Sequence, residues 1–110
     1  MSYDIHITRT AEEDLSEAVS YIDNVLLNPE ASDALLNALD IQAADLADSP
    51  EKYMLVDDPV LHSWGVRFTL VKNYLAFYVI EEESKTVHII RFLYGKRDWI
   101  TILRHGFSLD

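Results

Sequence analysis

The residues of this chain that could do chemistry gather in its C-terminal half, where positively charged side chains are interleaved with aromatic ones. This set consists of Arg67, Lys72, Tyr74, Tyr78, His88, Arg91, Tyr94, Lys96 and Arg97. Cations hold phosphate groups and aromatic rings stack on bases, so such a set could bind a nucleic acid. In RNA cleavage an arginine could also neutralise the charge that grows on the phosphate, while a tyrosine, histidine or lysine moves the proton.

Several of these residues have a structural interpretation as well. Tyr74 and Tyr78 are four positions apart, so they share one strand face and could be plain core or surface aromatics. His88 alternates with apolar neighbours, as a structural histidine would. Arg67 and Arg97 are the hardest to explain by packing alone, because a cation in or beside a buried strand costs core contacts.

The charge of the chain is unevenly distributed. The net charge over 110 residues is −10, which argues against a nucleic-acid binder when the chain is taken as a whole. Residues 1–58 hold fourteen acids and two bases, whereas residues 59–110 hold five acids and seven bases. This asymmetry predicts a local cationic surface on an acidic body.

Several classes of protein are excluded or disfavoured by composition. The chain has no cysteine, so it has neither disulfides nor thiolate sites, and its four histidines show no metal-ligand spacing. It also contains no glycine-rich phosphate loop, no GxSxG and no HExxH. We therefore expect no metal and no cofactor. The length predicts one domain over residues 1–110, and the lack of an apolar span or signal pattern predicts a cytoplasmic protein without membrane contact.

The cationic residues need a sheet to position them. Three runs rich in β-branched and aromatic residues, Gly65–Val71, Tyr74–Ile80 and Thr86–Tyr94, predict an antiparallel meander. Lys72-Asn73 suits a tight hairpin turn, and residues 81–85 suit a longer, solvated one.

The N-terminal half looks like the support for this sheet. Alternation over Tyr3–Arg9 predicts a half-buried strand with His6 on its outer side. Thr10 and Glu13 have the spacing of a capping box and predict the start of a helix, whose apolar stripe runs to Leu26. Asn28-Pro29 should begin a second helix, which Ser49-Pro50 ends. The two helices should form a hairpin across one sheet face.

Three further segments complete the prediction. Tyr53–Val56 is expected to be a short strand, and Asp57-Asp58-Pro59 a turn, although two adjacent acids could also hold a metal or a catalytic water. Asp98 is expected to cap a short helix over Asp98–Leu103. Arg91 could alternatively pair with Asp98 or Glu81 and so tie the sheet together.

Taken in order, the segments YDIHITRTAEEDL, GVR, VKNYLAFY and IIRFLYGKRDW resemble the RelE/ParE superfamily of toxins from bacterial type II toxin–antitoxin modules. The resemblance extends over roughly Tyr3 to Leu103. It implies an α+β fold with an N-terminal strand, a two-helix antiparallel hairpin packed on an antiparallel sheet, and a short C-terminal helix. It also implies a growth-inhibiting toxin that a cognate antitoxin neutralises by wrapping around it, as a dimer or a hetero-oligomer with that antitoxin.

The superfamily divides by target. RelE-like toxins cut mRNA in the ribosomal A site, whereas ParE-like toxins poison DNA gyrase. The resemblance implies a phosphate-stabilising role for Arg67 and Arg97, with Arg91 and Tyr74 as further catalytic candidates. The candidates for substrate binding are Lys72, Tyr94, Lys96 and His105.

Two departures from the RelE-like pattern are visible. Tyr74 stands where those enzymes carry a further arginine, and Leu103 stands where they carry a catalytic tyrosine, for which His105 is the candidate substitute. The sequence favours a ribosome-dependent mRNA endonuclease. It leaves open a ParE-like gyrase inhibitor and a degenerate, non-catalytic module that only binds an antitoxin.

Overall fold

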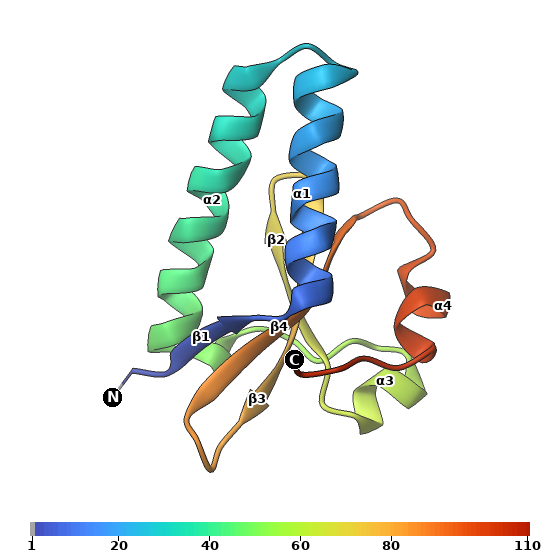
Figure 1. Ribbon diagram of the computed structural model, residues 1–110. Coiled ribbons are helices and arrows are strands. Elements are labelled where there is room, and N and C mark those ends of the chain that lie inside the picture. The colour runs from blue at the N-terminus through green and yellow to red at the C-terminus, as the bar shows by residue number, and fades with distance from the viewer. Residues whose placement is uncertain (1) are drawn as a thin grey trace.

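The computed structural model describes residues 2–110 and contains a four-stranded sheet with the strand order β1-β4-β3-β2 (Figure 1). The strands are β1 (Asp4–Ile7), β2 (Arg67–Val71), β3 (Tyr74–Glu81) and β4 (Thr86–Tyr94). Strands β2, β3 and β4 form the predicted antiparallel meander. β1 adds to it in parallel with β4 and places residues 4–7 opposite residues 86–89.

Helices cover both faces of this sheet (Figure 1). They are α1 (Arg9–Asn24), α2 (Pro29–Asp48), α3 (Pro59–Ser63) and α4 (Trp99–Arg104), with a 3-10 turn, η1, at Pro50–Lys52. One core lies between the sheet and the α1–α2 hairpin, and a second core lies between the sheet and the segments that carry α3 and α4. The predicted α+β architecture, with a hairpin on one face and a short C-terminal helix, is confirmed.

The start of α1 differs from the predicted capping box. Thr8 is the cap, since its Oγ1 accepts the Ala11 N–H at 3.2 Å, while Thr10 is an exposed residue of the first turn. The Thr8 hydroxyl also donates to the Ile89 carbonyl at 3.0 Å, so the same side chain starts the helix and joins it to β4. This tertiary hydrogen bond determines that α1 begins directly after Thr8. Leu26, predicted to lie in the core stripe, follows the end of α1 and is 55% exposed.

The other predicted caps are found where the sequence placed them. Asn28 Oδ1 accepts the Ala31 N–H at 3.2 Å and begins α2, which ends before Ser49 as predicted. Asp98 caps α4 by accepting the Thr101 N–H at 3.4 Å.

The segment between α2 and the sheet was predicted wrongly in part. Tyr53–Val56 does not form a strand, because only Leu55 makes an isolated antiparallel bridge, opposite Arg67. Asp58 does not merely form a turn: its carboxylate accepts the Leu61 N–H at 3.2 Å and caps α3. Pro59 then occupies the first helical position, where the missing N–H costs no hydrogen bond.

No helix among residues 2–110 is both long enough and apolar enough to cross a bilayer.

Candidate functional site

Arg91 is bound within the fold by an acid of α1. Its Nε and Nη2 donate to Asp14 Oδ2 and Oδ1 at 2.7 and 2.8 Å, and the Phe92 N–H donates to the same carboxylate at 3.0 Å. The Asp14 side chain is only 7% exposed. The expectation that Arg91 pairs with an acid is therefore correct, but the acid is Asp14 and neither Asp98 nor Glu81. The pair fastens α1 to β4 beyond the point where β1 ends.

Arg67 is also bound to neighbouring backbone. Its Nη1 donates to the Tyr53 carbonyl at 2.6 Å and to the Glu51 carbonyl at 3.3 Å. Tyr78, its cross-strand partner, is fully buried and donates its hydroxyl to the Pro50 carbonyl at 2.6 Å. Burial raises the pKa of Tyr78 well above its ordinary value. Arg67 and Tyr78 thus clamp the η1 segment against the sheet.

Four of the other six candidates meet at the opposite end of β2 and β3. There the Lys72-Asn73 turn and the segment after β4 face the far end of the helical hairpin, and a depression of about 720 Å³ lies between them. We call this depression the hairpin-tip groove. Its principal lining residues are Tyr21, Ile22, Leu26, Leu35, Lys72, Tyr74, Tyr94 and Arg97. It therefore brings together four of the eight predicted site residues.

Aromatic rings form one wall of the hairpin-tip groove. Tyr74 and Tyr94 are cross-strand partners whose ring centroids lie 5.6 Å apart in an edge-on contact. Tyr74 also stacks on Phe92, with centroids 5.0 Å apart and planes only 6° from parallel. Burial raises the pKa of Tyr74, and the phenols of Tyr94 and Tyr21 raise it further. The Tyr74 phenol is therefore held in its protonated form at neutral pH.

Two cations lie at the exposed edge of the hairpin-tip groove. Lys72 and Arg97 are exposed, and neither makes an ion pair or a side-chain hydrogen bond within residues 2–110. Arg67 lies four residues along β2 from Val71, which corresponds to roughly 13 Å of strand. The structure thus separates Arg67 from Arg97.

The remaining candidates lie outside the groove. Lys96 and His105 are exposed and do not line it. His105 directly follows α4, whose Leu103 is fully buried in the core on the other sheet face.

A histidine pair was missed by the sequence analysis. His6 was expected to be a surface residue, but its Nδ1 lies 2.8 Å from His88 Nδ1 because the two residues are partners in the parallel β1–β4 pairing. His88 Nε2 donates to Glu81 Oε1 at 2.9 Å, and this bond lowers the pKa of Glu81. No sequence spacing predicts this contact, since 82 residues separate the two rings.

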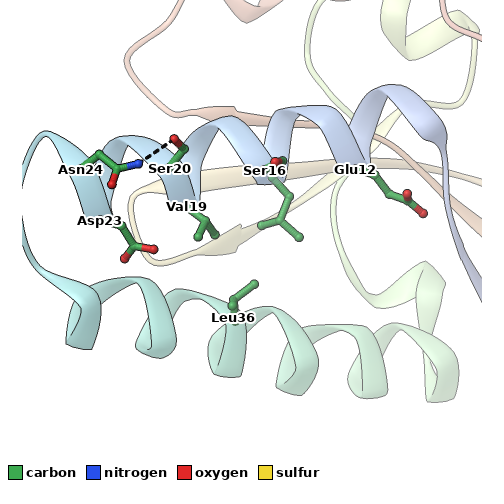
Figure 2. A pocket seen from close by; sticks show the side chains of 8 residues that line it. Glu12, Ser16, Val19, Ser20, Asp23, Asn24 and Leu36 are labelled. Carbon is green, nitrogen blue, oxygen red and sulfur yellow. Dashed lines mark hydrogen bonds between the residues drawn. The ribbon is translucent and has the colours of Figure 1, made fainter.

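A second depression lies on α1 and faces Leu36 of α2 (Figure 2). Its polar side chains come from α1 and include Glu12, Ser16, Ser20 and Asp23, with no cation among its lining residues. It contains none of the predicted site residues. Across residues 2–110 no three histidine or carboxylate side chains gather in a way that could hold a metal ion.

Two solved structures show which class of protein has this fold. One is described as the chromosomal ParDE toxin–antitoxin system from P. aeruginosa; it has a TM-score of 0.69 and 19% identity, and the match covers 86% of this chain and 98% of that one. The other is the toxin–antitoxin complex RelBE2 from Mycobacterium tuberculosis, with a TM-score of 0.60, 22% identity and coverage of 86% and 99%. The fold is that of the RelE/ParE toxins.

The sequence identifies the family within this class. Residues 5–99 match the family model described as the ParE toxin of the type II toxin–antitoxin system, parDE. The chain therefore belongs to the ParE toxin family of type II toxin–antitoxin systems. The sequence matches none of the curated proteins with which it was compared.

Proposed function

We propose that this toxin arrests growth by binding DNA gyrase, the target that the resemblance to ParE-like toxins implies, and that it does not cut mRNA. The observation that carries this proposal is the placement of the three candidate arginines. Arg91 is paired with Asp14, and Arg67 is bound to backbone carbonyls. Of these three, only Arg97 has neither an ion pair nor a side-chain hydrogen bond among the described residues.

The site also lacks a suitable group for proton transfer. RNA cleavage needs a side chain that takes the 2′-hydroxyl proton and has a pKa near the working pH. Tyr74, one of the catalytic candidates, lines the same hollow as Arg97, and its pKa is raised. His105, the candidate substitute for the catalytic tyrosine, does not line the hairpin-tip groove. Leu103, at the position where the RelE-like resemblance expects a tyrosine, is buried in the opposite core.

The charge of the chain supports a protein target. With a net charge of −10, the chain would be repelled by the polyanionic surroundings of the ribosomal A site. A protein target without a comparable density of negative charge would not repel the chain in this way.

Ribosome-dependent mRNA cleavage remains the second candidate, because one observation favours it. The hairpin-tip groove combines Lys72 and Arg97 with Tyr74 and Tyr94, a set that could hold a phosphate and stack a base. On this alternative these four residues would contact the RNA, and Arg67 and Arg91 would act only through the fold.

We also propose that a cognate antitoxin neutralises the chain. The support is that both structural relatives are described as toxin–antitoxin systems or complexes.

Induced expression in a bacterial host tests the proposed target. We expect growth arrest together with loss of negative supercoiling in a reporter plasmid, whereas primer extension should find messages intact. Messages cut within codons while plasmid topology is unchanged would overturn the gyrase proposal in favour of mRNA cleavage.

A further inference from the structure

We propose that the loop end of the helical hairpin is the surface by which this toxin binds gyrase, and that it docks on a positively charged surface of the enzyme, of the kind that holds DNA. This inference rests on the proposed gyrase target and specifies which part of the chain contacts it. It is carried by a group of exposed apolar residues and by the charge of the helices around them.

Four apolar residues are exposed together where α1 ends and the chain turns into α2. We call them the loop cluster: Tyr21, Val25, Leu26 and Leu27, each more than half exposed. They lie at the end of α1 opposite β1, where the hairpin projects away from that strand (Figure 1). Apolar side chains gathered in this way are typical of a surface that another protein covers.

The backbone at Leu27 supports a role in contact with a partner. Leu27 has a φ of 51°, a left-handed conformation that glycine or asparagine adopts at lower cost, and its side chain is 76% exposed. The turn is fastened on both sides of it, since the Leu26 N–H donates to the Tyr21 carbonyl at 3.1 Å and the Asn28 N–H donates to the Ile22 carbonyl at 3.0 Å. An apolar side chain is thus held in solvent against local preference, as is typical of a functional position.

The charge of the hairpin specifies the partner's chemistry. Residues 10–51 contain eleven acids and no lysine, arginine or histidine. Of these acids, only Asp14 and Asp45 form ion pairs within residues 2–110. Glu30 and Asp33, which follow the loop cluster in α2, are exposed. The apolar end of the hairpin is therefore surrounded by negative charge that the rest of the described chain does not neutralise.

The depression on α1 extends this surface toward the start of the helix. Its lining runs from Glu12 to Asp23 and Asn24, which lie just before the end of α1, and it includes the apolar side chains of Val19 and Leu36 (Figure 2). The aliphatic stem of a lysine or arginine packs on such apolar side chains while its charged end remains beside a carboxylate. The depression, about 490 Å³ in volume, thus suits a basic side chain of a partner.

Gyrase offers the complementary chemistry. An enzyme that supercoils DNA must hold its phosphates with lysines and arginines, and such a surface also attracts carboxylates. A net charge of −10 would steer the chain toward it, and the loop cluster would supply the apolar contact.

Binding of the full-length chain to DNA-free gyrase holoenzyme tests this chemistry. We expect biolayer interferometry to show an affinity that falls as salt is added. Heparin, a polyanion that occupies basic protein surfaces, should compete with the chain. Binding that neither salt nor heparin weakens would overturn the proposal.

Leu27→Asn tests the apolar contact without damage to the fold. It should lower the affinity for gyrase by about tenfold. Its Tm should equal or exceed that of the parent chain, because asparagine adopts the left-handed conformation more readily. Met54→Asn, a matched change at a residue that is 71% exposed outside the hairpin, should keep the parental affinity. Parental affinity in both Leu27→Asn and Val25→Asn would overturn the proposal.

Charge reversal separates the hairpin from the overall field. The variants E30K/D33K and D4K/E83K change the net charge by the same amount, but Asp4 and Glu83 are exposed residues of β1 and of the β3–β4 turn. E30K/D33K should weaken binding about tenfold more than D4K/E83K does. Equal effects would show that only the overall charge matters and would overturn the proposal.

The same measurements distinguish this inference from the proposed function. A parent chain that does not bind gyrase would overturn both. A parent chain that binds and inhibits gyrase, with the hairpin variants equally active, would overturn the docking surface alone. If the parent chain is a dimer that Leu27→Asn converts to a monomer, the loop cluster binds a second copy and the inference fails.

Discussion

Arg91 and Asp14 form a two-point ion pair that joins the last strand to the first helix across 77 residues of sequence. The carboxylate is nearly buried, and the same group accepts a backbone N–H of β4. The pair therefore belongs to the framework of the fold, and the chemistry of the toxin has to be sought elsewhere.

Arg91→Met should lower the free energy of unfolding by about 3 kcal/mol, because it leaves the Asp14 charge buried without its partner. Urea denaturation measures this loss. Arg97→Met, which removes an arginine without an ion pair, should change stability by no more than about 0.5 kcal/mol. Equal stability of the two variants would show that the Arg91 pair contributes nothing.

Arg67→Met should lower the free energy of unfolding by about 1.5 kcal/mol, through loss of its charged hydrogen bonds to the η1 segment. The folded fraction should still arrest growth. The measurements are denaturant unfolding and growth after induction. A variant that is as stable as the parent chain but no longer toxic would assign Arg67 a direct role at the target.

The pH dependence of stability should reveal the contact between Asp58 and Arg104. The Arg104 guanidinium lowers the pKa of Asp58 below its ordinary value of 3.8. Because the folded-state pKa is the lower one, this contribution is fully present above the unfolded-state pKa and is lost as the pH falls through the folded-state pKa. Asp58→Asn should thus lower Tm at pH 7, and the gap to the parent chain should close in acid. A gap that stays constant down to pH 2 would contradict this.

The histidine pair predicts defined tautomers. Glu81 is ionised at neutral pH and can only accept, so His88 must carry a proton on Nε2. When both rings are neutral, His88 Nδ1 is then the acceptor, and His6 must donate from Nδ1. Long-range ¹H–¹⁵N NMR should find His6 as the Nδ1–H tautomer. A neutral His6 protonated on Nε2 beside a neutral His88 would contradict the observed contact.

Local patterns in the sequence predicted much of the fold. The three C-terminal strands follow from runs of β-branched and aromatic residues, and Asn28 and Asp98 cap helices because their short side chains reach the backbone N–H three residues on. As threonines, Thr8 and Thr10 are equally suitable N-caps for α1. The choice between them depends on the Thr8 bond to Ile89, which is a tertiary contact.

Only half of the predicted site residues line the hairpin-tip groove, again because tertiary contacts decide where each side chain lies. Tyr74 and Tyr94 meet because they are register partners in a meander that the sequence reveals. The apolar residues Tyr21 and Leu26 that line the groove were missed, since helical spacing assigned Leu26 to the core stripe and gave no role to Tyr21. Arg67 and Arg91 looked catalytic because their partners, backbone carbonyls and Asp14, come from distant parts of the chain.

DNA supercoiling by purified gyrase tests the central claim most directly. Relaxed plasmid, gyrase and ATP are incubated with increasing amounts of the chain, and a parallel reaction supplies ribosomes loaded with a defined mRNA. We predict that supercoiling is inhibited in proportion to the toxin added, equally by the parent chain and by folded Arg67→Met, while the ribosome-bound mRNA stays intact. Undiminished supercoiling together with cleaved mRNA would contradict the account.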